Sequence, residues 1–312
     1  MTNSMPVSIV RDLQSAFGIT FSEALPVSGG WLNQKWRITT ERGSLLVKQY
    51  SLRRYRPHKL ERIEEALQRQ LLAREQGVRC PFLLQRDGRV LRRPDPETVY
   101  MVMEFCEGRI ETPETLSPVQ MESLGETCGQ LHRVLSEIPT EPVLPASGGY
   151  SPMLLERFFS EKRDGPAGYS GAIQQAESIF AGLDQRLFDQ PRGLAHEDIQ
   201  PGNLLFDGQG VTALIDFDRC CFSFPAHDIG RALLSFALEK GGMNREKAAA
   251  FREGYSRFRP LSEDDLQSAL RLTWCIELPW WFTTDFFREC SGVPARFLWE
   301  MRWMTENWER LL

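Results

Sequence analysis

The hydrophobic pattern of this 312-residue chain changes from strand-like to helix-like near residue 108, and this change limits the folds that it can adopt. Before that point, KWRITT (35–40) and SLLVKQY (44–50) are short β-branched and apolar runs joined by ERG, which is typical of a β-hairpin. TVYMVMEFCEG (98–108) predicts one more strand. Beyond it, apolar residues recur mainly at helical spacing. We therefore expect an α+β fold with a small β-rich lobe and a larger, mostly helical lobe.

Two stretches give the clearest helical signals. Leucine and isoleucine recur at helical spacing from 60 to 71, and Glu64 falls within this stripe, whereas Glu61 and Glu65 point away. Ser117 and Gln120 form a capping box that predicts the start of a second amphipathic helix. The expected organisation is an N-terminal lobe of residues 1–103, a linker of residues 104–108 and a C-terminal lobe of residues 109–312.

The composition excludes several classes of protein. A content of 42% hydrophobic and 25% charged residues is that of an ordinary globular protein. The formal net charge of −5 argues against nucleic acid and against a polybasic membrane surface as partners. No apolar segment is long enough to span a membrane, and the beginning of the chain does not resemble a signal peptide. The 7 cysteines, an odd number without CxxC spacing, favour a reducing cytoplasm over a disulfide framework or a zinc site.

The stretch GLAHEDIQPGNLLF (193–206) concentrates His196, Asp198 and Asn203 in one loop. Its apolar end, NLLF, is separated from VTALIDF by DGQG, so the loop is expected to lead into a hairpin whose second strand delivers Asp216 and Asp218. Such a hairpin would bring these carboxylates close to the loop.

These residue types suit phosphoryl transfer. The carboxylate of Asp198 can accept a proton from an attacking hydroxyl, while Asn203 and Asp216 offer the hard oxygen ligands that Mg²⁺ prefers. Because the transferred group reacts roughly in line, the protein must hold hydroxyl, metal and phosphate in one fixed geometry. A base five residues before a metal-binding amide lets one loop serve both tasks.

At these residues the chain resembles the aminoglycoside phosphotransferase and choline kinase-like family, small-molecule relatives of the protein kinases. HEDIQPGN (196–203) looks like the family's HxDxxxxN, and LIDFD (214–218) looks like its metal-binding segment. The segments SGGWLNQKWRI (28–38), LLVKQY (45–50), VMEFCEG (102–108) and DIGRAL (228–233) lie in the family's order. The likeness covers about residues 20 to 235 and implies a bilobal protein-kinase-like fold.

The resemblance implies a role for each matching position, with ATP, or GTP, and Mg²⁺ as cofactors. Asp198 would be the catalytic base, His196 would hold the loop in shape, and Asn203 and Asp216 would bind Mg²⁺. Lys48 would contact the α- and β-phosphates and pair with a carboxylate of the following helix. The helical wheel favours Glu64 for that pair, although its register leaves Glu61 and Glu65 open.

The remaining implied positions support the nucleotide and the loop. Gly29 and Gly30, followed by Asn33, would cover the phosphates. The carbonyl of Glu104 and the amide of Cys106 would meet the adenine, with Met103 beside the ring. Asp228 would brace the catalytic loop, and Asp218 would be a second carboxylate near the metal.

The sequence also departs from the family pattern. Glu197 stands where many relatives have glycine, and Gln200 where many have histidine. Asp228 follows Asp218 by only ten positions, too few for the activation loop of a protein kinase. A small acceptor is therefore favoured over a protein.

The acceptor site is expected in the C-terminal third. Ser262 and Asp265 predict the start of a helix whose inward face reaches Glu277. Candidate acceptor-binding residues nearby are Glu277, Trp274, Trp281 and Asp285. An acidic, aromatic-lined pocket of this kind would favour a cationic or polyhydroxylated acceptor, such as an aminoglycoside, choline or homoserine. A competing interpretation is that the tryptophans belong to the core.

Three other functions fit part of the sequence. A kinase of protein serine or threonine is disfavoured by the short segment after Asp218. A nucleotide-binding pseudokinase is disfavoured because Lys48, Asp198, Asn203 and Asp216 are all present. A metal phosphohydrolase built on His196, Asp198, His227 and Asp228 would require an all-helical site, against the strand pattern around Asn203 and Asp216.

Overall fold

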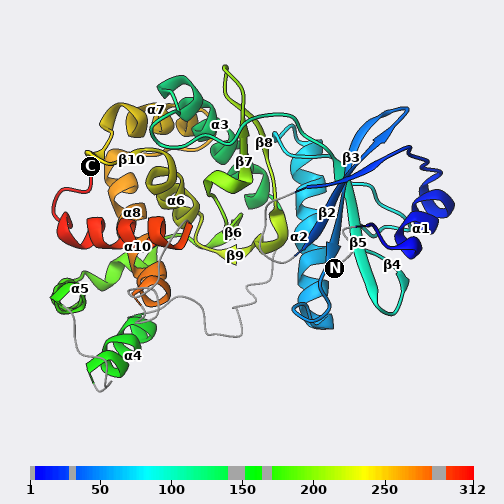
Figure 1. Ribbon diagram of the computed structural model, residues 1–312. Helices are drawn as coiled ribbons and strands as arrows, with labels where there is room; N and C mark the ends of the chain where they lie inside the picture. Colours follow the sequence, from blue (N-terminus) through cyan, green and yellow to red (C-terminus); the bar gives the residue numbers. More distant parts are fainter. Residues whose placement is uncertain (1–3, 28–32, 140–151, 164–170, 283–292) are drawn as a thin grey trace. The chain divides into compact units, whose positions relative to one another are not determined.

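The chain separates into two compact units (Figure 1). The computed structural model describes residues 4–27, 33–139, 152–163, 171–282 and 293–312. The first unit comprises Met1–Arg109, Asn203–Asp207 and Val211–Cys220, and the second comprises Ile110–Gly202, Gly208–Gly210 and Cys221–Leu312. Each unit is described by itself below.

The first unit contains a five-stranded antiparallel sheet in the order β1-β2-β3-β5-β4. Its strands are β1 (Ala24–Pro26), β2 (Gln34–Thr40), β3 (Gly43–Tyr50), β4 (Arg92–Asp95) and β5 (Thr98–Glu104), and its helices are α1 (Val7–Phe17) and α2 (Pro57–Glu75). The predicted hairpin of residues 35–50 is therefore confirmed as β2 and β3, and the predicted strand after it is β5.

Alternation along the strands gives the sheet two buried faces. In β3, Leu46 and Tyr50 pack with α2, whereas Val47 points to the opposite face and packs with α1. Figure 1 shows the two helices on opposite sides of the sheet. Since Lys48 lies two residues from both Leu46 and Tyr50, it shares the face that α2 covers.

A short hairpin from later in the chain completes the first unit. It consists of β7 (Leu204–Phe206) and β8 (Val211–Leu214), followed by the 3₁₀ turn η3 (Phe217–Arg219). Backbone hydrogen bonds join Arg109 to Phe206 at 2.8 and 2.9 Å, and Leu214 N donates to Arg79 O at 2.7 Å. These bonds explain why the units differ from the two continuous lobes expected from the sequence: the hairpin is attached to the β-rich part of the chain.

The second unit is mainly helical. Its helices are α3 (Pro118–Ser136), α4 (Pro152–Arg163), α5 (Gly171–Ala181), α6 (Pro225–Phe236), α7 (Arg245–Ser256), α8 (Glu263–Trp281) and α10 (Val293–Glu306), with the 3₁₀ turn η1 (Gln185–Asp189). Two short strand pairs are β6 (Gly193–Ala195) with β9 (Cys221–Ser223), and β10 (Leu238–Glu239) with β11 (Gly242–Met243). The turn η2 (Pro201–Asn203) closes the loop that follows β6.

Local signals place the helices that matter for the site. Ser117 and Ser262 both form the predicted capping boxes, with Gln120 and Asp265 as their reciprocal partners. The pair β6–β9 places His196 directly after a strand, since Ala195 is opposite Cys221. Among the described residues, none of the helices combines the length and apolar character that crossing a membrane requires.

Candidate active site

A buried lysine and two aspartates form the centre of the site in the first unit. Lys48 is 2% exposed, and its Nζ lies 2.8 Å from Asp216 Oδ1 and 2.7 Å from Asp218 Oδ2. Burial alone would lower the pKa of Lys48, but the negative charges of Asp218 and Asp216 outweigh it and raise the pKa. The ammonium group is therefore held charged beside the start of η3.

Asp218 is fixed more tightly than its sequence position suggests. Tyr50 Oη donates to Asp218 Oδ1 at 2.8 Å, so both carboxylate oxygens are engaged, one by the phenol and one by Lys48. Burial raises the pKa of Asp218, while the charge of Lys48 opposes that rise. Asp218 thus contacts Lys48 as closely as Asp216 does.

The two predicted metal ligands lie on adjoining backbone. Ile215 N donates to Asn203 O at 2.9 Å, which brings the residue before Asp216 against Asn203. Asp216 has φ +65°, a left-handed conformation that aspartate adopts more easily than most residues. One carboxylate and one amide oxygen fit Mg²⁺, which usually takes one or two carboxylates and completes its shell with water and substrate phosphates.

The ion pair predicted between Lys48 and Glu64 is not formed in the described structure. The carboxylate of Glu64 instead accepts hydrogen bonds from Val90 N at 2.9 Å and Leu91 N at 2.8 Å, and from Gln68. Glu64 therefore fastens α2 to the segment that precedes β4. The helical wheel correctly predicted the face on which Glu64 lies, but a wheel does not show that the carboxylates that contact Lys48 are Asp218 of η3 and Asp216, the residue before η3.

Lys35 is a residue that the sequence interpretation missed. It is directly opposite Lys48 in the β2–β3 register, so the two side chains share one face of the sheet. Burial and the charge of Lys48 lower the pKa of Lys35, whereas Asp216 and Asp218 act in the opposite direction. The signal was available in the predicted hairpin, because a two-residue period places Lys35 beside Lys48.

The other predicted nucleotide residues have mixed outcomes. Gly29 and Gly30 lie outside the described residues. Asn33 Oδ1 accepts from Ser51 N at 3.4 Å, linking the start of β2 to the end of β3. Met103 is buried against α2 at the end of β5. The other two residues, Glu104 and Cys106, are half-buried at the expected linker.

The loop that carries Asp198 is organised by a buried aspartate in the second unit. Asp228, on α6, accepts from His196 N at 2.6 Å and from Glu197 N at 2.8 Å. His132 Nε2 lies 3.1 Å from the same carboxylate. Burial raises the pKa of Asp228, but the hydrogen bond from His132 and the neighbouring histidine charges bring it below its ordinary value. Asp228 thus lies where the predicted bracing role requires.

The backbone conformation of Glu197 shows why many relatives have glycine at this position. Its φ of +65° lies in the left-handed region that glycine adopts without cost. A glutamate can be kept there only by surrounding contacts, and Glu197 Oε1 lies 3.2 Å from His227 Nδ1. Asp198 follows directly and is half-buried, whereas His196 is fully buried.

Two of the predicted acceptor residues need correction. Trp274 is 0% exposed and donates its indole N–H to Thr305 Oγ1 at 2.9 Å, so it belongs to the core. Glu277 is buried, with His227 and Arg231 against its oxygens at 3.0 and 3.2 Å, so its charge is already neutralised. Its inward orientation was predicted correctly, but this does not make it accessible to a cation.

The other two acceptor candidates are Trp281 and Asp285. Trp281 is half-buried, stacks on Phe297 and donates its indole N–H to Glu277 at 3.1 Å. Asp285 lies outside the described residues.

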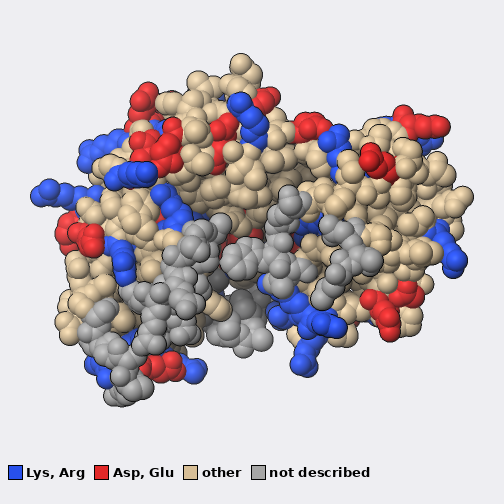
Figure 2. Space-filling view, in the orientation of Figure 1, with Lys and Arg blue, Asp and Glu red and all other residues tan. Residues whose placement is uncertain are grey.

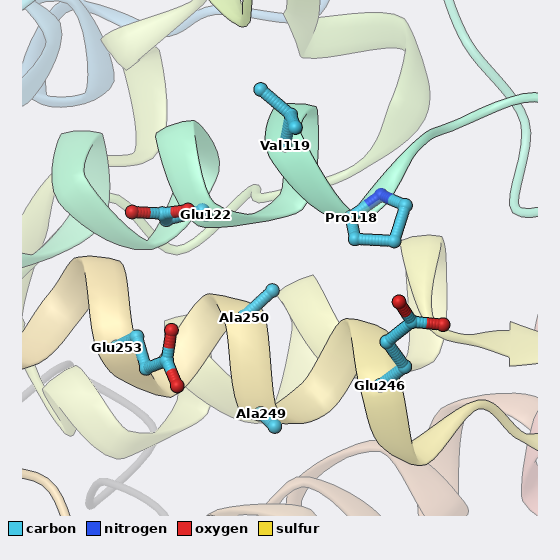
Figure 3. Close-up of a pocket in the computed structure, with 7 residues that line it drawn as sticks. All are labelled: Pro118, Val119, Glu122, Glu246, Ala249, Ala250 and Glu253. Atoms are coloured by element: carbon cyan, nitrogen blue, oxygen red, sulfur yellow. The ribbon is translucent and has the colours of Figure 1, made fainter.

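A surface pocket of about 280 Å³ lies elsewhere in the second unit (Figure 3). It is lined by Pro118, Val119 and Glu122 of α3 and by Glu246, Ala249, Ala250 and Glu253 of α7. None of the acceptor candidates that the structure describes, Trp274, Glu277 and Trp281, lines it. Figure 2 shows acidic and basic side chains interspersed over the visible face, in keeping with the modest net charge.

A family model and several known proteins match this chain. The model of the Phosphotransferase enzyme family matches residues 23–261. A homoserine kinase of Bradyrhizobium sp. (strain ORS 278) is 28% identical over 213 residues, which cover 62% of this chain and 59% of that protein. The homoserine kinase of Brucella abortus (strain S19) is 25% identical over 256 residues, 79% of this chain and 73% of that one. The chain thus spans 59% of the length of the first relative.

Solved structures support the fold class. An aminoglycoside phosphotransferase from Alicyclobacillus acidocaldarius aligns with a TM-score of 0.65 at 16% identity, covering 100% of this chain and 95% of that one. An amicoumacin kinase in complex with AMP-PNP and Ca²⁺ aligns with a TM-score of 0.63 at 15% identity, covering 97% and 94%. At these identities the likeness concerns the fold alone, and it confirms the α+β kinase-like class.

Proposed function

Since this chain belongs to the phosphotransferase enzyme family, we propose that it transfers the γ-phosphate of a magnesium-bound nucleoside triphosphate, ATP or GTP, to a hydroxyl of a small molecule. The observation that carries this proposal is the cluster of Lys48, Asp216 and Asp218 in the first unit, with Asn203 on adjoining backbone. It offers a cation for phosphates and oxygen ligands for a metal.

The first unit would bind the nucleotide. Asn203 and Asp216 would hold Mg²⁺, which supplies positive charge to the phosphates and withdraws electron density from them. Lys48 would leave Asp216 for the α- and β-phosphates while Asp218 and Tyr50 keep it in place. Because the ammonium is already charged and keeps its contact with Asp218, only its contact with Asp216 would be exchanged when the nucleotide binds.

The second unit would supply the base. Asp198 would accept the proton of the acceptor hydroxyl as the oxygen attacks the γ-phosphorus, from a loop that Asp228 holds by two backbone amides. Asp198 precedes Asn203 by five residues, so the chain itself limits their separation to about 18 Å. A base on this loop is therefore always tethered to the proposed metal ligand.

The acceptor is proposed to be a small amino alcohol or a polyhydroxylated amine. Curated relatives are named homoserine kinase, and one aligned structure is a spectinomycin phosphotransferase in complex with ADP and spectinomycin. Between Asp218 and Asp228 the chain forms the rest of η3, strand β9 and the start of α6, which leaves no long segment to bind a peptide. This observation argues against a protein acceptor.

An acceptor screen tests the proposal. Purified protein is incubated with Mg²⁺ and either ATP or GTP, and release of the nucleoside diphosphate is followed with homoserine, choline-like amines, aminoglycosides, sugars and a generic protein as acceptors. We expect release that depends on one of the small hydroxylated amines. Release that depends only on the protein would contradict the proposal.

Single substitutions of Glu64, the predicted partner of Lys48, and of Asp218, the observed one, separate their roles. Glu64→Gln places an amide –NH₂ against the N–H of Val90 or Leu91, so the free energy of unfolding should fall by about 1–3 kcal/mol while nucleotide affinity is kept. Asp218→Asn should instead weaken nucleotide binding, because Lys48 loses a close carboxylate. Thermal unfolding and nucleotide titration of both variants check this. A loss of nucleotide affinity in Glu64→Gln alone would restore the original assignment.

Lys35 is expected to add a second positive charge to the triphosphate site. Lys35→Gln should weaken binding of the triphosphate roughly tenfold, the equivalent of about one charge-assisted hydrogen bond, and leave adenosine binding unchanged. Isothermal titration with both ligands measures the difference. The control is Lys59→Gln, since Lys59 is an exposed lysine of α2 in the same unit. Equal losses for the two variants would remove the role of Lys35.

A further inference from the structure

A connected series of oppositely charged side chains runs through the second unit, beginning at the residue before Asp198. In order of contact they are Glu197, His227, Glu277, Arg231, Glu300 and Arg296. All except Arg296 are buried. Since removing charges from water is costly unless they are paired, each buried member depends on its neighbours.

His227 is held as an imidazolium by its two neighbours. Its Nδ1 lies 3.2 Å from Glu197 Oε1 and its Nε2 lies 3.0 Å from Glu277 Oε1. The other oxygen of Glu277 accepts from Arg231 and from Trp281. Burial alone would raise the pKa of Glu277, but the charge of Arg231 and the hydrogen bond from His227 bring it below its ordinary value, which favours the ionised carboxylate. A protonated ring can donate from both nitrogens, one to each of these carboxylates. Burial alone would lower the pKa of His227, but Glu197 and Glu277 raise it to about 10.

Close packing of α6 on α8 fixes the position of His227. A Cβ at Gly230 would collide with Thr273 Oγ1 and lie only 2.6 Å from Ala269 O, so the two helices approach closely only with glycine there. Thr273 Oγ1 also donates to His227 O at 3.5 Å. The histidine therefore has little freedom to follow Glu197 if the loop moves.

The charged side chains hold the loop on both sides of Asp198. On one side, His227 contacts the side chain of Glu197, whose backbone is left-handed at φ +65°. On the other side, Arg231 donates to Ser235 Oγ at 3.0 Å, and Ser235 donates to Ile199 O at 3.4 Å. The flanking residues are thus fixed from α6.

We infer that His227 is a positioning residue of the phosphotransfer reaction, which keeps Glu197 in its left-handed conformation and thereby orients the carboxylate of Asp198. The inference rests on the proposed function. His227 does not touch the substrate in this scheme, and its whole effect passes through the backbone of Glu197. Glycine would hold the same backbone without it, so the need for His227 is tied to the glutamate in this chain.

A double-mutant cycle tests this dependence. In the parent chain, His227→Gln should lower kcat about tenfold and leave the nucleotide affinity unchanged, because the nucleotide groups lie in the first unit. In a chain that carries Glu197→Gly, the same change should lower kcat by less than about threefold. Equal losses in both backgrounds would overturn the inference. If His227→Gln does not fold, Glu197→Gln, which removes the charge facing His227, takes its place, and unchanged kcat would then be the contrary result.

Arg296→Gln is the control for a loss of stability that does not act through the loop. Arg296 lies at the far end of the charged series and donates to the carbonyls of Leu234 and Leu238. This variant should lower the melting temperature without changing kcat. The charge of His227 is read independently of turnover by NMR titration of its ring, which should stay protonated well above pH 7. A ring that titrates near its ordinary value of 6.5 would contradict the inference. Absence of turnover in the parent chain would count against the proposed function, and the NMR result would still test His227.

The raised pKa of His227 also gives a stability test. Because the folded value is about 10 and the ordinary value is 6.5, the stabilisation by the charged ring is complete below pH 6.5 and is lost as the pH rises toward 10. The difference in unfolding free energy between the parent chain and His227→Gln should shrink over that window. A difference that is constant with pH would contradict the charged state.

Discussion

Replacing Asp198 by asparagine is expected to lower kcat by about 10²–10⁴-fold, the range that general-base assistance contributes, while the affinity for the magnesium–nucleotide complex stays unchanged. The amide keeps the size of the carboxylate but is too weakly basic to take the proton of the hydroxyl. Nucleotide affinity is retained because Lys48 and Asp216 belong to the first unit. Steady-state kinetics and nucleotide titration of the same preparation measure the two effects.

The matched control for this variant is Asp189→Asn. Asp189 is an exposed aspartate of η1 in the second unit, so the same chemical change is made away from the loop. Turnover of the control should equal that of the parent chain. Full turnover by Asp198→Asn would remove Asp198 from the role of base and leave the loop with only a structural function.

Asp216→Asn is expected to abolish the dependence of nucleotide affinity on Mg²⁺. Asparagine tolerates the left-handed backbone at φ +65°, so the change removes a charge without forcing the turn to rearrange. The metal would lose its carboxylate, and we expect affinity for the magnesium–nucleotide complex to fall by at least about 10–100-fold, a loss seen even for groups one step removed from a metal. Nucleotide titrations with Mg²⁺ and with a chelator measure the dependence.

Lys48 keeps Asp218 and Tyr50 beside it in this variant, so the first unit should stay folded. Asp12→Asn is the control, because Asp12 is an ion-paired aspartate of the same unit, 2.9 Å from Arg92 and bonded to Tyr100. It should lower stability without changing the magnesium dependence. If Asp216→Asn binds the nucleotide as the parent chain does with and without Mg²⁺, Asp216 is not a metal ligand.

Local sequence signals predicted much of the fold. The two-residue period gave β2 and β3 within one residue, and the capping boxes at Ser117 and Ser262 gave the starts of α3 and α8. These features depend on neighbours within a few positions, so they can be predicted from the local sequence. The hairpin after the loop followed from the same kind of signal, with DGQG between two apolar runs.

Contacts between distant segments were less predictable. Lys48 meets Asp218 across 170 positions, and no wheel or period relates a strand to a turn so far along the chain. The contacts of Trp274 and Glu277 were not predictable for the same reason, because a helical stripe shows which face is inward but not whether that face meets a ligand or another helix. The charge of His227 could not be predicted from the sequence around it, because it depends on the carboxylates of Glu197 and Glu277, which lie 30 and 50 positions away.

The most direct test of the account follows the phosphate itself. The protein is incubated with Mg²⁺ and ATP labelled in its γ-phosphate, together with homoserine and the other small amino alcohols, and the products are separated and identified by mass spectrometry. The account predicts that the label appears as a phosphomonoester on the hydroxyl of one acceptor, and that chelation of Mg²⁺ or the Asp198→Asn change prevents its formation. Label that remains in bound ATP, or is released only as inorganic phosphate with every acceptor, would contradict it.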